Sequence, residues 1–169
     1  MEFCKVIENR FSVREYDEKT VEEDVLQRIL EVFRTSPTAK NRQPVRLIVV
    51  KDKDMLEKID GISPCRYGAT LAFLVCSDEN EAWIDRKSHS RGEMDATIAA
   101  THIMLSCTNE GLGTCWVCLF DEDKTRALFE LPDNIKPQCF IMAGYPKENT
   151  QPNERHTIRH ELRDTVKII

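Results

Sequence analysis

Residues 94–116 constrain the fold more than any other part of this chain, because they form the longest stretch that is nearly free of charge. Residues 96–107 contain no charged residue and mix large apolar side chains with alanine and threonine. A helix that is apolar on nearly all sides is normally buried on most of them. The pattern predicts a buried core helix that ends near Glu110. Gly111 would take the left-handed position after the helix, and Gly113 would allow a tight turn into the next strand.

Length and charge exclude several classes of protein. At 169 residues the chain has the size of one domain, residues 1–169, that can bury a core of its own. The formal net charge is −5, and no basic stripe of the kind that binds nucleic acid is present. The N-terminus lacks the apolar core of a signal peptide, and no run approaches the roughly 18 apolar residues of a membrane span. We therefore expect a cytoplasmic protein that binds neither nucleic acid nor membrane.

Seven cysteines are scattered at wide spacing, which suits buried thiols in a reducing compartment better than a disulfide framework. Only Cys115 and Cys118 are close, with the Cys-x-x-Cys spacing of a redox pair or of half a zinc site. Trp116 and Val117 between them have strand character, and no second pair or flanking histidine completes a metal site. We predict no metal site, and a redox role for this pair stays open.

A short basic segment near the N-terminus carries side chains that suit a phosphate. In an extended segment alternate residues share a face, so Arg10, Ser12 and Arg14 would point to one side. Phe11 and Val13 would point to the other. Two guanidinium groups with a hydroxyl between them can bind a phosphate. The same spacing also fits a solvated strand edge, and the segment alone leaves both readings open.

Helices and strands alternate along the rest of the chain. Residues 21–34 have the apolar spacing of an amphipathic helix, and Thr20 begins a T-V-E-E capping box. The polar, proline-bounded segment 35–44 is longer than a connection between a helix and a strand needs. Residues 79–93 are mostly polar, with Trp83 as their one aromatic side chain, and are expected at the surface, where they could cover a site. The other predicted elements are strands at 47–50, 71–76, 114–120 and 138–143, and helices at 2–9, 55–59 and 122–131.

Four motifs follow one another in the chain. They are R-x-S-x-R-x-Y at 10–16, S-P-T-A-x-N-x-Q-P at 36–44, G-L-G-T-C-W at 111–116 and G-Y-P at 144–146. Neither the G-x-G-x-x-G fingerprint of a dinucleotide-binding Rossmann fold nor a P-loop is present. In this order and spacing, over residues 2 to about 159, the motifs resemble the nitroreductase family of FMN flavoproteins.

The resemblance implies an α+β fold with a central, mainly antiparallel sheet wrapped by helices. It also implies a homodimer with FMN at the subunit interface and the long buried helix at the dimer core. In that arrangement Arg10 and Ser12, with Phe11 beside them, would hold the flavin phosphate, and Arg14 would approach the pyrimidine edge of the ring. The remaining flavin-binding residues that the resemblance implies are Pro37, Thr38, Ala39 and Asn41 from the partner subunit, Gly113, Thr114, Cys115 and Trp116 along the ring, and Arg155 or Arg159 at the phosphate.

Two positions depart from the family pattern. Many members have a glycine-containing segment after G-x-G-T-x-W, whose backbone N–H meets flavin N5, but residues 117–120 read Val-Cys-Leu-Phe. An aromatic residue often follows Gln-Pro in the family, but Val45 and Arg46 stand there, which implies a more open or more cationic pocket.

The activity that the resemblance implies is transfer of hydride from NADH or NADPH to a nitroaromatic, quinone or related small-molecule acceptor, in a ping-pong cycle on FMN. No side chain stands out as a general acid, so the flavin would carry the chemistry and no catalytic side chain is predicted. One alternative is a non-catalytic flavin- or nucleotide-binding protein that serves as a sensor or store, since fold does not fix function. Another is a dimeric interaction module built on the apolar helix.

Overall fold

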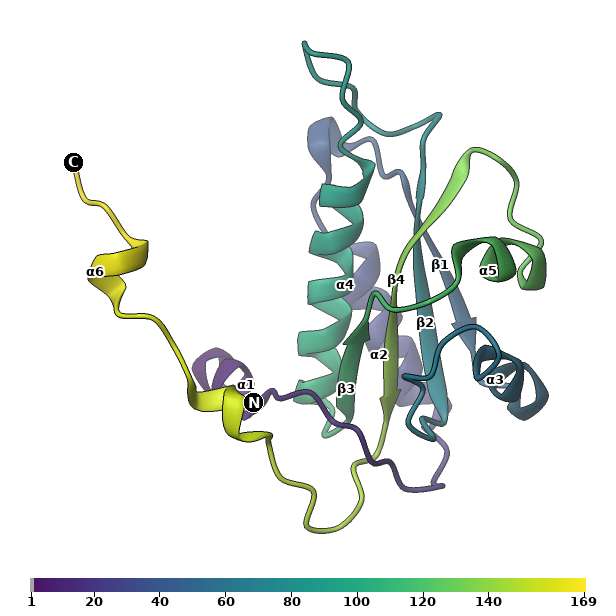
Figure 1. Ribbon diagram of the computed structural model, residues 1–169, viewed down its shortest axis with the longest axis vertical. Helices are drawn as coiled ribbons and strands as arrows, with labels where there is room; N and C mark the ends of the chain where they lie inside the picture. Colours follow the sequence, from purple (N-terminus) through teal and green to yellow (C-terminus); the bar gives the residue numbers. More distant parts are fainter. Residues whose placement is uncertain (1) are drawn as a thin grey trace.

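The computed structural model describes residues 2–169, and a four-stranded antiparallel sheet forms its centre (Figure 1). The strand order is β1-β2-β4-β3, and every neighbouring pair is antiparallel, as the predicted fold class requires. The strands are β1 (Val45–Val50), β2 (Leu71–Asp78), β3 (Gly113–Val117) and β4 (Ile135–Gly144). The helices are α1 (Phe3–Asn9), α2 (Glu23–Arg34), α3 (Lys53–Ile59), α4 (Gly92–Asn109), α5 (Glu122–Leu128) and α6 (Leu162–Thr165), with 3-10 turns at Ala39–Asn41 and Glu154–Thr157.

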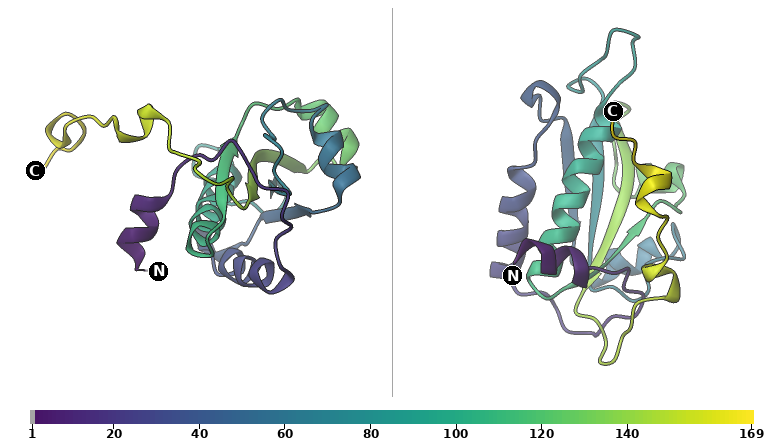
Figure 2. Two further views of the ribbon diagram at one scale, coloured as in Figure 1. Left: turned by 90° about the horizontal axis from the view of Figure 1, so that it is seen from below. Right: turned by 90° about the vertical axis from the view of Figure 1, so that its left-hand side faces the viewer.

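Helices cover both faces of the sheet (Figure 2). All eight residues of β2 are buried, and alternate side chains enter two different cores. Phe73 packs in the core with residues of α2 and α4, whereas Leu74 packs in the core with residues of α3. A strand buried on both faces reads as a continuous apolar run, which explains why this strand was recognisable from the sequence.

The long helix α4 forms as predicted and ends in a Schellman motif. The N–H of Leu112 donates to the carbonyl of Cys107 over 2.8 Å, and the N–H of Gly111 donates to that of Thr108 over 3.1 Å. Gly111 has a φ of 79° and makes the turn. The prediction that Gly113 also serves the turn is wrong, because Gly113 is the first residue of β3 and is absent from the positive-φ glycines.

The start of α2 also differs from the prediction. The helix begins at Glu23 rather than near Thr20, and no side chain caps it. Glu23, the residue that the capping box would have used, instead pairs with Lys51 at 2.5 Å, and Glu22 accepts a hydrogen bond of 2.5 Å from the Tyr145 hydroxyl. A tertiary contact therefore competes with the local capping pattern at this position.

The N-terminal helix and the C-terminal tail stand away from the sheet (Figures 1 and 2). Arg155, Arg159 and Arg163 recur at helical spacing, yet the tail forms a 3-10 turn at Glu154–Thr157 and a separate short helix α6 rather than one helix. Among residues 2–169, no helix is long and apolar enough to cross a membrane.

Candidate functional site

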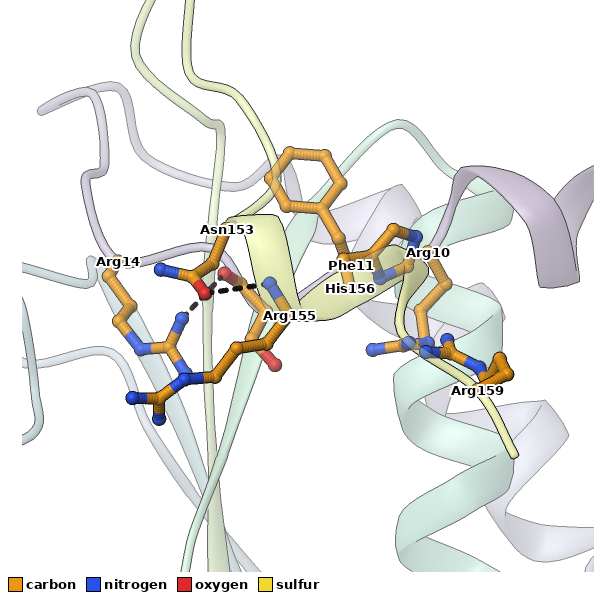
Figure 3. Close-up of a pocket in the computed structure, with 8 residues that line it drawn as sticks. Arg10, Phe11, Arg14, Asn153, Arg155, His156 and Arg159 are labelled. Atoms are coloured by element: carbon orange, nitrogen blue, oxygen red, sulfur yellow. Dashed lines mark hydrogen bonds between the residues drawn. The ribbon is translucent and has the colours of Figure 1, made fainter.

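A cavity of about 490 Å³ lies between the segment that follows α1 and the tail that follows β4 (Figure 3). Four guanidinium groups face it, and none of the described residues that line it is acidic. Figure 3 shows Arg14 and Arg155 on one side and Arg10 and Arg159 on the other. Such a cluster attracts an anion with several oxygens, because forked guanidinium donors match phosphate geometry. The full lining is Arg10, Phe11, Ser12, Arg14, Asn153, Arg155, His156 and Arg159.

Close packing against β3 fixes the N-terminal half of this cavity. The N–H of Val13 donates to the carbonyl of Thr114 over 2.8 Å, and Ser12 forms a parallel bridge with Thr114. This approach requires glycine at position 113. A Cβ atom on Gly113 would lie 2.5 Å from a methyl carbon of Val13 and 3.0 Å from Pro146. Glycine at position 113 therefore allows the segment with Arg10, Ser12 and Arg14 to pack against the edge of the sheet.

Tyr16, the tyrosine of the R-x-S-x-R-x-Y motif, joins the segment with Ser12 and Arg14 to strand β4. The Tyr16 hydroxyl lies 3.0 Å from the carbonyl of Val13 and 3.2 Å from that of Met142. Burial raises the pKa of Tyr16 above its ordinary value, so the hydroxyl stays protonated and can donate. Val13 is buried, while the Arg14 side chain remains exposed and donates to the Ser12 carbonyl over 3.3 Å.

The C-terminal half of the cavity arrives because the chain reverses after β4. The N–H of Asp17 donates to the carbonyl of Tyr145 over 2.8 Å, and the N–H of Lys147 donates to that of Glu15 over 3.1 Å. These bonds align the two segments side by side. Residues far apart in the sequence, Arg10 and Arg14 on one hand and Arg155 on the other, thereby line one space.

Two lining residues, Asn153 and His156, were not predicted from the sequence. The Asn153 side-chain oxygen accepts a hydrogen bond of 3.1 Å from the N–H of Arg155 and so starts the 3-10 turn. An asparagine two residues before the bonded N–H is a recognisable turn signal. His156 meets the Phe11 ring edge-on, with 6.3 Å between the ring centroids. No local signal identifies His156, because its partner lies at the other end of the chain. Phe11 also lines the cavity, although alternation along the segment alone placed it on the opposite face from Arg10 and Ser12.

The residues of β3 do not present one surface. Cys115 is buried in the core with Val13, whereas Trp116 packs against the core that contains α4 residues, on the opposite face of the sheet. The Thr114 hydroxyl is buried without a hydrogen-bond partner among the described residues. Burial raises the pKa of the Cys115 thiol, an effect that the nearby Arg14 opposes only in part. Cys115 is therefore a neutral thiol rather than a reactive thiolate.

The loop that contains Pro37, Thr38, Ala39 and Asn41 lies at the opposite end of α4 from the cavity (Figure 1). Ala39 contacts Asp95 in the first turn of α4, whereas the cavity lies against β3, which follows the last turn. At about 1.5 Å per residue, the two ends of this helix are roughly 25 Å apart. One chain thus gathers the predicted arginines but does not bring the loop to them.

Comparison with known proteins decides the family. The sequence model of the nitroreductase family matches residues 7–67 and 66–145, which together make up most of the chain. The chain belongs to the nitroreductase family. The resemblance carried by the four motifs is therefore confirmed.

Several known proteins align with nearly the whole chain. A nitroreductase family protein of Clostridium difficile 630 has a solved structure with 36% sequence identity and a TM-score of 0.93, covering 99% of this chain and 98% of that one. An NADH dehydrogenase/NAD(P)H nitroreductase of Methanothermobacter thermautotrophicus is 33% identical over 158 residues, 88% of this chain and 80% of that protein. The FMN reductase [NAD(P)H] of Bacillus subtilis is 27% identical over 91% of this chain and 70% of its own length.

Two departures from the family pattern take a definite form in the structure. Arg46 does not add a free cation, because its guanidinium lies 3.1 Å from Asp78 and 2.8 Å from Glu81. After β3, the side chain of Cys118 is exposed and accepts a hydrogen bond of 3.2 Å from the Trp116 indole N–H. The Cys-x-x-Cys pair thus joins one buried and one exposed thiol. Within residues 2–169, no three His, Cys, Asp or Glu side chains gather to hold a metal ion.

Proposed function

We propose that this protein is an FMN-dependent oxidoreductase that takes hydride from NADH or NADPH and reduces a nitroaromatic, quinone or related acceptor in a ping-pong cycle. The observation that carries the proposal is the cavity with four guanidinium groups and no acidic lining residue in the described chain. A phosphate dianion loses its hydration on binding, and several charged donors offset that cost. When bound, FMN supplies the two-electron chemistry.

The residues present fit the phosphate end of FMN. Arg10, Arg155 and Arg159 would bind the phosphate with their guanidinium groups, and the Ser12 hydroxyl would donate a further hydrogen bond. Asn153 and the Phe11–His156 contact would hold the tail in place around it. Binding of the phosphate would therefore tie the tail to the segment that follows α1.

The ring end of FMN would lie toward Arg14 and β3. A cation near the pyrimidine edge stabilises the negative charge of the reduced ring and raises the reduction potential. The unpaired Thr114 hydroxyl in the buried edge of β3 is a further donor available on that side. Cys115 would contribute surface rather than redox chemistry, because its buried thiol is neutral.

The names of the relatives support the same chemistry. Proteins named NAD(P)H nitroreductase and FMN reductase [NAD(P)H] align over 88% and 91% of this chain, so their cofactor and electron donors are our proposal for it. We also propose a cytoplasmic location, because the cysteines are free thiols, as expected in a reducing compartment.

We further propose that the working form is a homodimer with FMN at the interface. The segment with Thr38 and Asn41 cannot reach the cavity of its own chain, but it could reach that of a second copy. Large apolar side chains on α4 and on the N-terminal helix and C-terminal tail, the parts that project in Figure 2, are exposed, which is costly for an isolated chain. They include Phe3 and Ile7 of α1, Met94 of α4, and Ile158, Leu162, Val166, Ile168 and Ile169 of the tail. A twofold dimer would bury both copies of this surface.

The first experiment is an anaerobic titration of the purified protein. We expect a yellow protein, or one that acquires a flavin spectrum with added FMN, and loss of the visible absorption band of oxidised flavin after NADPH or NADH is added. A protein that gains no flavin band with excess FMN would contradict the proposal.

The main alternative is a non-catalytic flavin-binding protein. It is favoured by the absence of glycine in residues 117–120, where many family members have the segment whose backbone N–H meets flavin N5. It predicts FMN binding without turnover. Steady oxidation of NADH or NADPH with a quinone or nitroaromatic acceptor would exclude it. Parallel lines in double-reciprocal plots of the initial rate against NADH or NADPH, at several acceptor concentrations, would support the ping-pong cycle.

A further inference from the structure

A buried carboxylate connects the loop after α2 to the first turn of α4. Asp95 is only 3% exposed, and its Oδ1 accepts a hydrogen bond of 2.9 Å from the N–H of Ala39. We propose that Asp95 is a positioning residue that sets Thr38 and Asn41 for the flavin bound by a second copy of the chain, an inference that rests on the proposed function. Asp95 does not touch the flavin in this account. It acts through the backbone of Ala39.

The loop needs such an anchor because its backbone is unfavourable on its own. Lys40, Asn41 and Gln43 have φ values of 53°, 54° and 53°, in the left-handed region that residues with a side chain rarely adopt. Three such residues within four positions persist only where surrounding contacts hold them. One contact is internal, since the Thr38 hydroxyl oxygen accepts a hydrogen bond of 2.9 Å from the N–H of Gln43. Among residues 2–169, the hydrogen bond from the Ala39 N–H to Asp95 joins this turn to α4.

The environment of Asp95 distinguishes an anchor from a packing residue. A buried carboxylate is costly to desolvate, and an apolar side chain would fill the same space without that cost. The Oδ2 atom of Asp95 has no hydrogen-bond partner among the described residues, so the bond to Ala39 is what its side chain gains. A charged acceptor binds a backbone N–H more strongly than a neutral one.

Neighbouring cations are committed to other groups. The Arg91 guanidinium, which lines the same cavity as Asp95, bonds to Asp85. The Lys40 ammonium lies over the Trp83 ring, 5.6 Å from its centroid. Within residues 2–169 no ion pair to Asp95 is present. Its carboxylate is therefore available to the loop and to the favourable electrostatic environment at the start of α4.

The arrangement links the two parts of the proposed interface. Helix α4 would pack against its copy, and the loop would reach the flavin of that copy. Because Asp95 joins the two, the position of Thr38 and Asn41 follows the position of the helix. Loosening the bond should therefore weaken flavin binding without removing any group that contacts the phosphate.

The first test measures the loop in the protein without flavin. Trypsin cleaves after Lys40 and Arg42, both exposed, and the cleavage rate follows how often the loop opens. We expect Asp95→Ala to increase cleavage at these two sites by about tenfold, the effect of losing a hydrogen bond to a charged group. Asp95→Asn keeps an oxygen acceptor of the same shape and should stay within about threefold of the wild type.

The second test measures FMN affinity by fluorescence titration of the full-length variants. The dissociation constant should rise by about tenfold in Asp95→Ala and should be largely restored in Asp95→Asn. The control is Glu93→Ala, which removes an exposed acidic residue from the same helical turn and should change neither the cleavage nor the affinity. A general loss of fold would increase cleavage at sites throughout the chain, and rescue by asparagine would be absent.

A third variant removes the donor instead of the acceptor. Ala39→Pro lacks the N–H, and proline suits this position because Ala39 begins the 3-10 turn and Thr38 before it is extended, with φ −135° and ψ 158°. In an Ala39→Pro background, Asp95→Ala should add no further loss of FMN affinity. Additive losses would overturn the proposal, and so would wild-type cleavage and affinity in Asp95→Ala. A wild-type protein that binds no FMN would instead overturn the proposed function, while the cleavage test would still report on the anchor.

Discussion

Substitution of Gly113 is the sharpest test of how the segment with Arg10, Ser12 and Arg14 packs against the sheet. In Gly113→Ala the new Cβ atom would lie 2.5 Å from a methyl carbon of Val13, 2.8 Å from its Cβ and 3.0 Å from Pro146. Two contacts below 3.0 Å with a branched side chain and one of 3.0 Å with a proline ring can be relieved only by moving the backbone. Overpacking of this kind costs about 2 kcal/mol. For a chain of this length that corresponds to a fall in Tm of roughly 4–8 °C.

The displaced segment carries Ser12 and Arg14, so Gly113→Ala should also weaken FMN binding. Thermal unfolding and FMN titration measure the two effects. Gly111→Ala is the matched control. Its φ of 79° is strained for alanine, yet nothing lies within 4 Å of the added Cβ, so stability should fall while FMN affinity is kept.

A second variant tests the assigned cause. Val13→Ala removes the methyl groups that the new Cβ would meet, so the cost of the double variant should be smaller than the sum of the single costs by at least about 1 kcal/mol. Strictly additive costs would refute the clash with Val13, and an unchanged Tm in Gly113→Ala would refute the packing argument altogether.

Three further predictions follow from the cavity and from the pKa shifts. Arg10→Gln should weaken FMN by about tenfold or more in a fluorescence titration and leave the weaker binding of riboflavin unchanged, because only the phosphate loses a charged donor. The hydrogen bond from Tyr145 lowers the pKa of Glu22 from 4.5 to about 2, so its stabilising contribution is present above pH 4.5 and is lost as the pH falls toward 2. Acid unfolding of Tyr145→Phe should therefore show a smaller loss of stability across this pH range than the wild type. Because burial raises the pKa of Cys115, iodoacetamide at neutral pH should label the exposed Cys118 well before Cys115, as peptide mass spectrometry can measure; equal rates would contradict the burial of Cys115.

Much of the secondary structure was predictable because local patterns and tertiary packing agree. The core of α4, the apolar run of β2 and the amphipathic face of α2 each match their burial in the structure. The left-handed conformation of Gly111 was predictable in the same way, because glycine directly after a buried helix is the usual residue at which the helix ends and the chain turns.

Element boundaries failed where a distant residue competes with a local pattern. The start of α2 differs because Lys51 takes the carboxylate of Glu23 that the capping box would have used, and Tyr145 takes that of the neighbouring Glu22. The role of Gly113 was misassigned for a similar reason. A glycine near a turn suggests conformational freedom, but the structure uses its missing side chain to admit Val13.

The candidate site divides in the same way. The chemistry of Arg10, Ser12 and Arg14 was readable from alternation along an extended segment. Their meeting with Arg155 and Arg159 was implied by resemblance to the family. Only the structure revealed that Asn153 and His156 line the cavity. It also revealed that the loop at Ala39 lies away from the cavity.

By itself the sequence determined the elements, the buried helix and the residue types that suit a phosphate, because periodicity, turn chemistry and charge act over a few neighbouring residues. The tertiary structure decided which face of β3 each side chain takes, how closely Val13 approaches Gly113, and which end of α4 holds the loop through Asp95. These depend on contacts between residues far apart in the chain, whose distances no local pattern encodes. The long apolar helix α4 shows both influences. Its sequence required burial, and the fold placed the arginine-lined cavity near one end of the helix and the loop at the other.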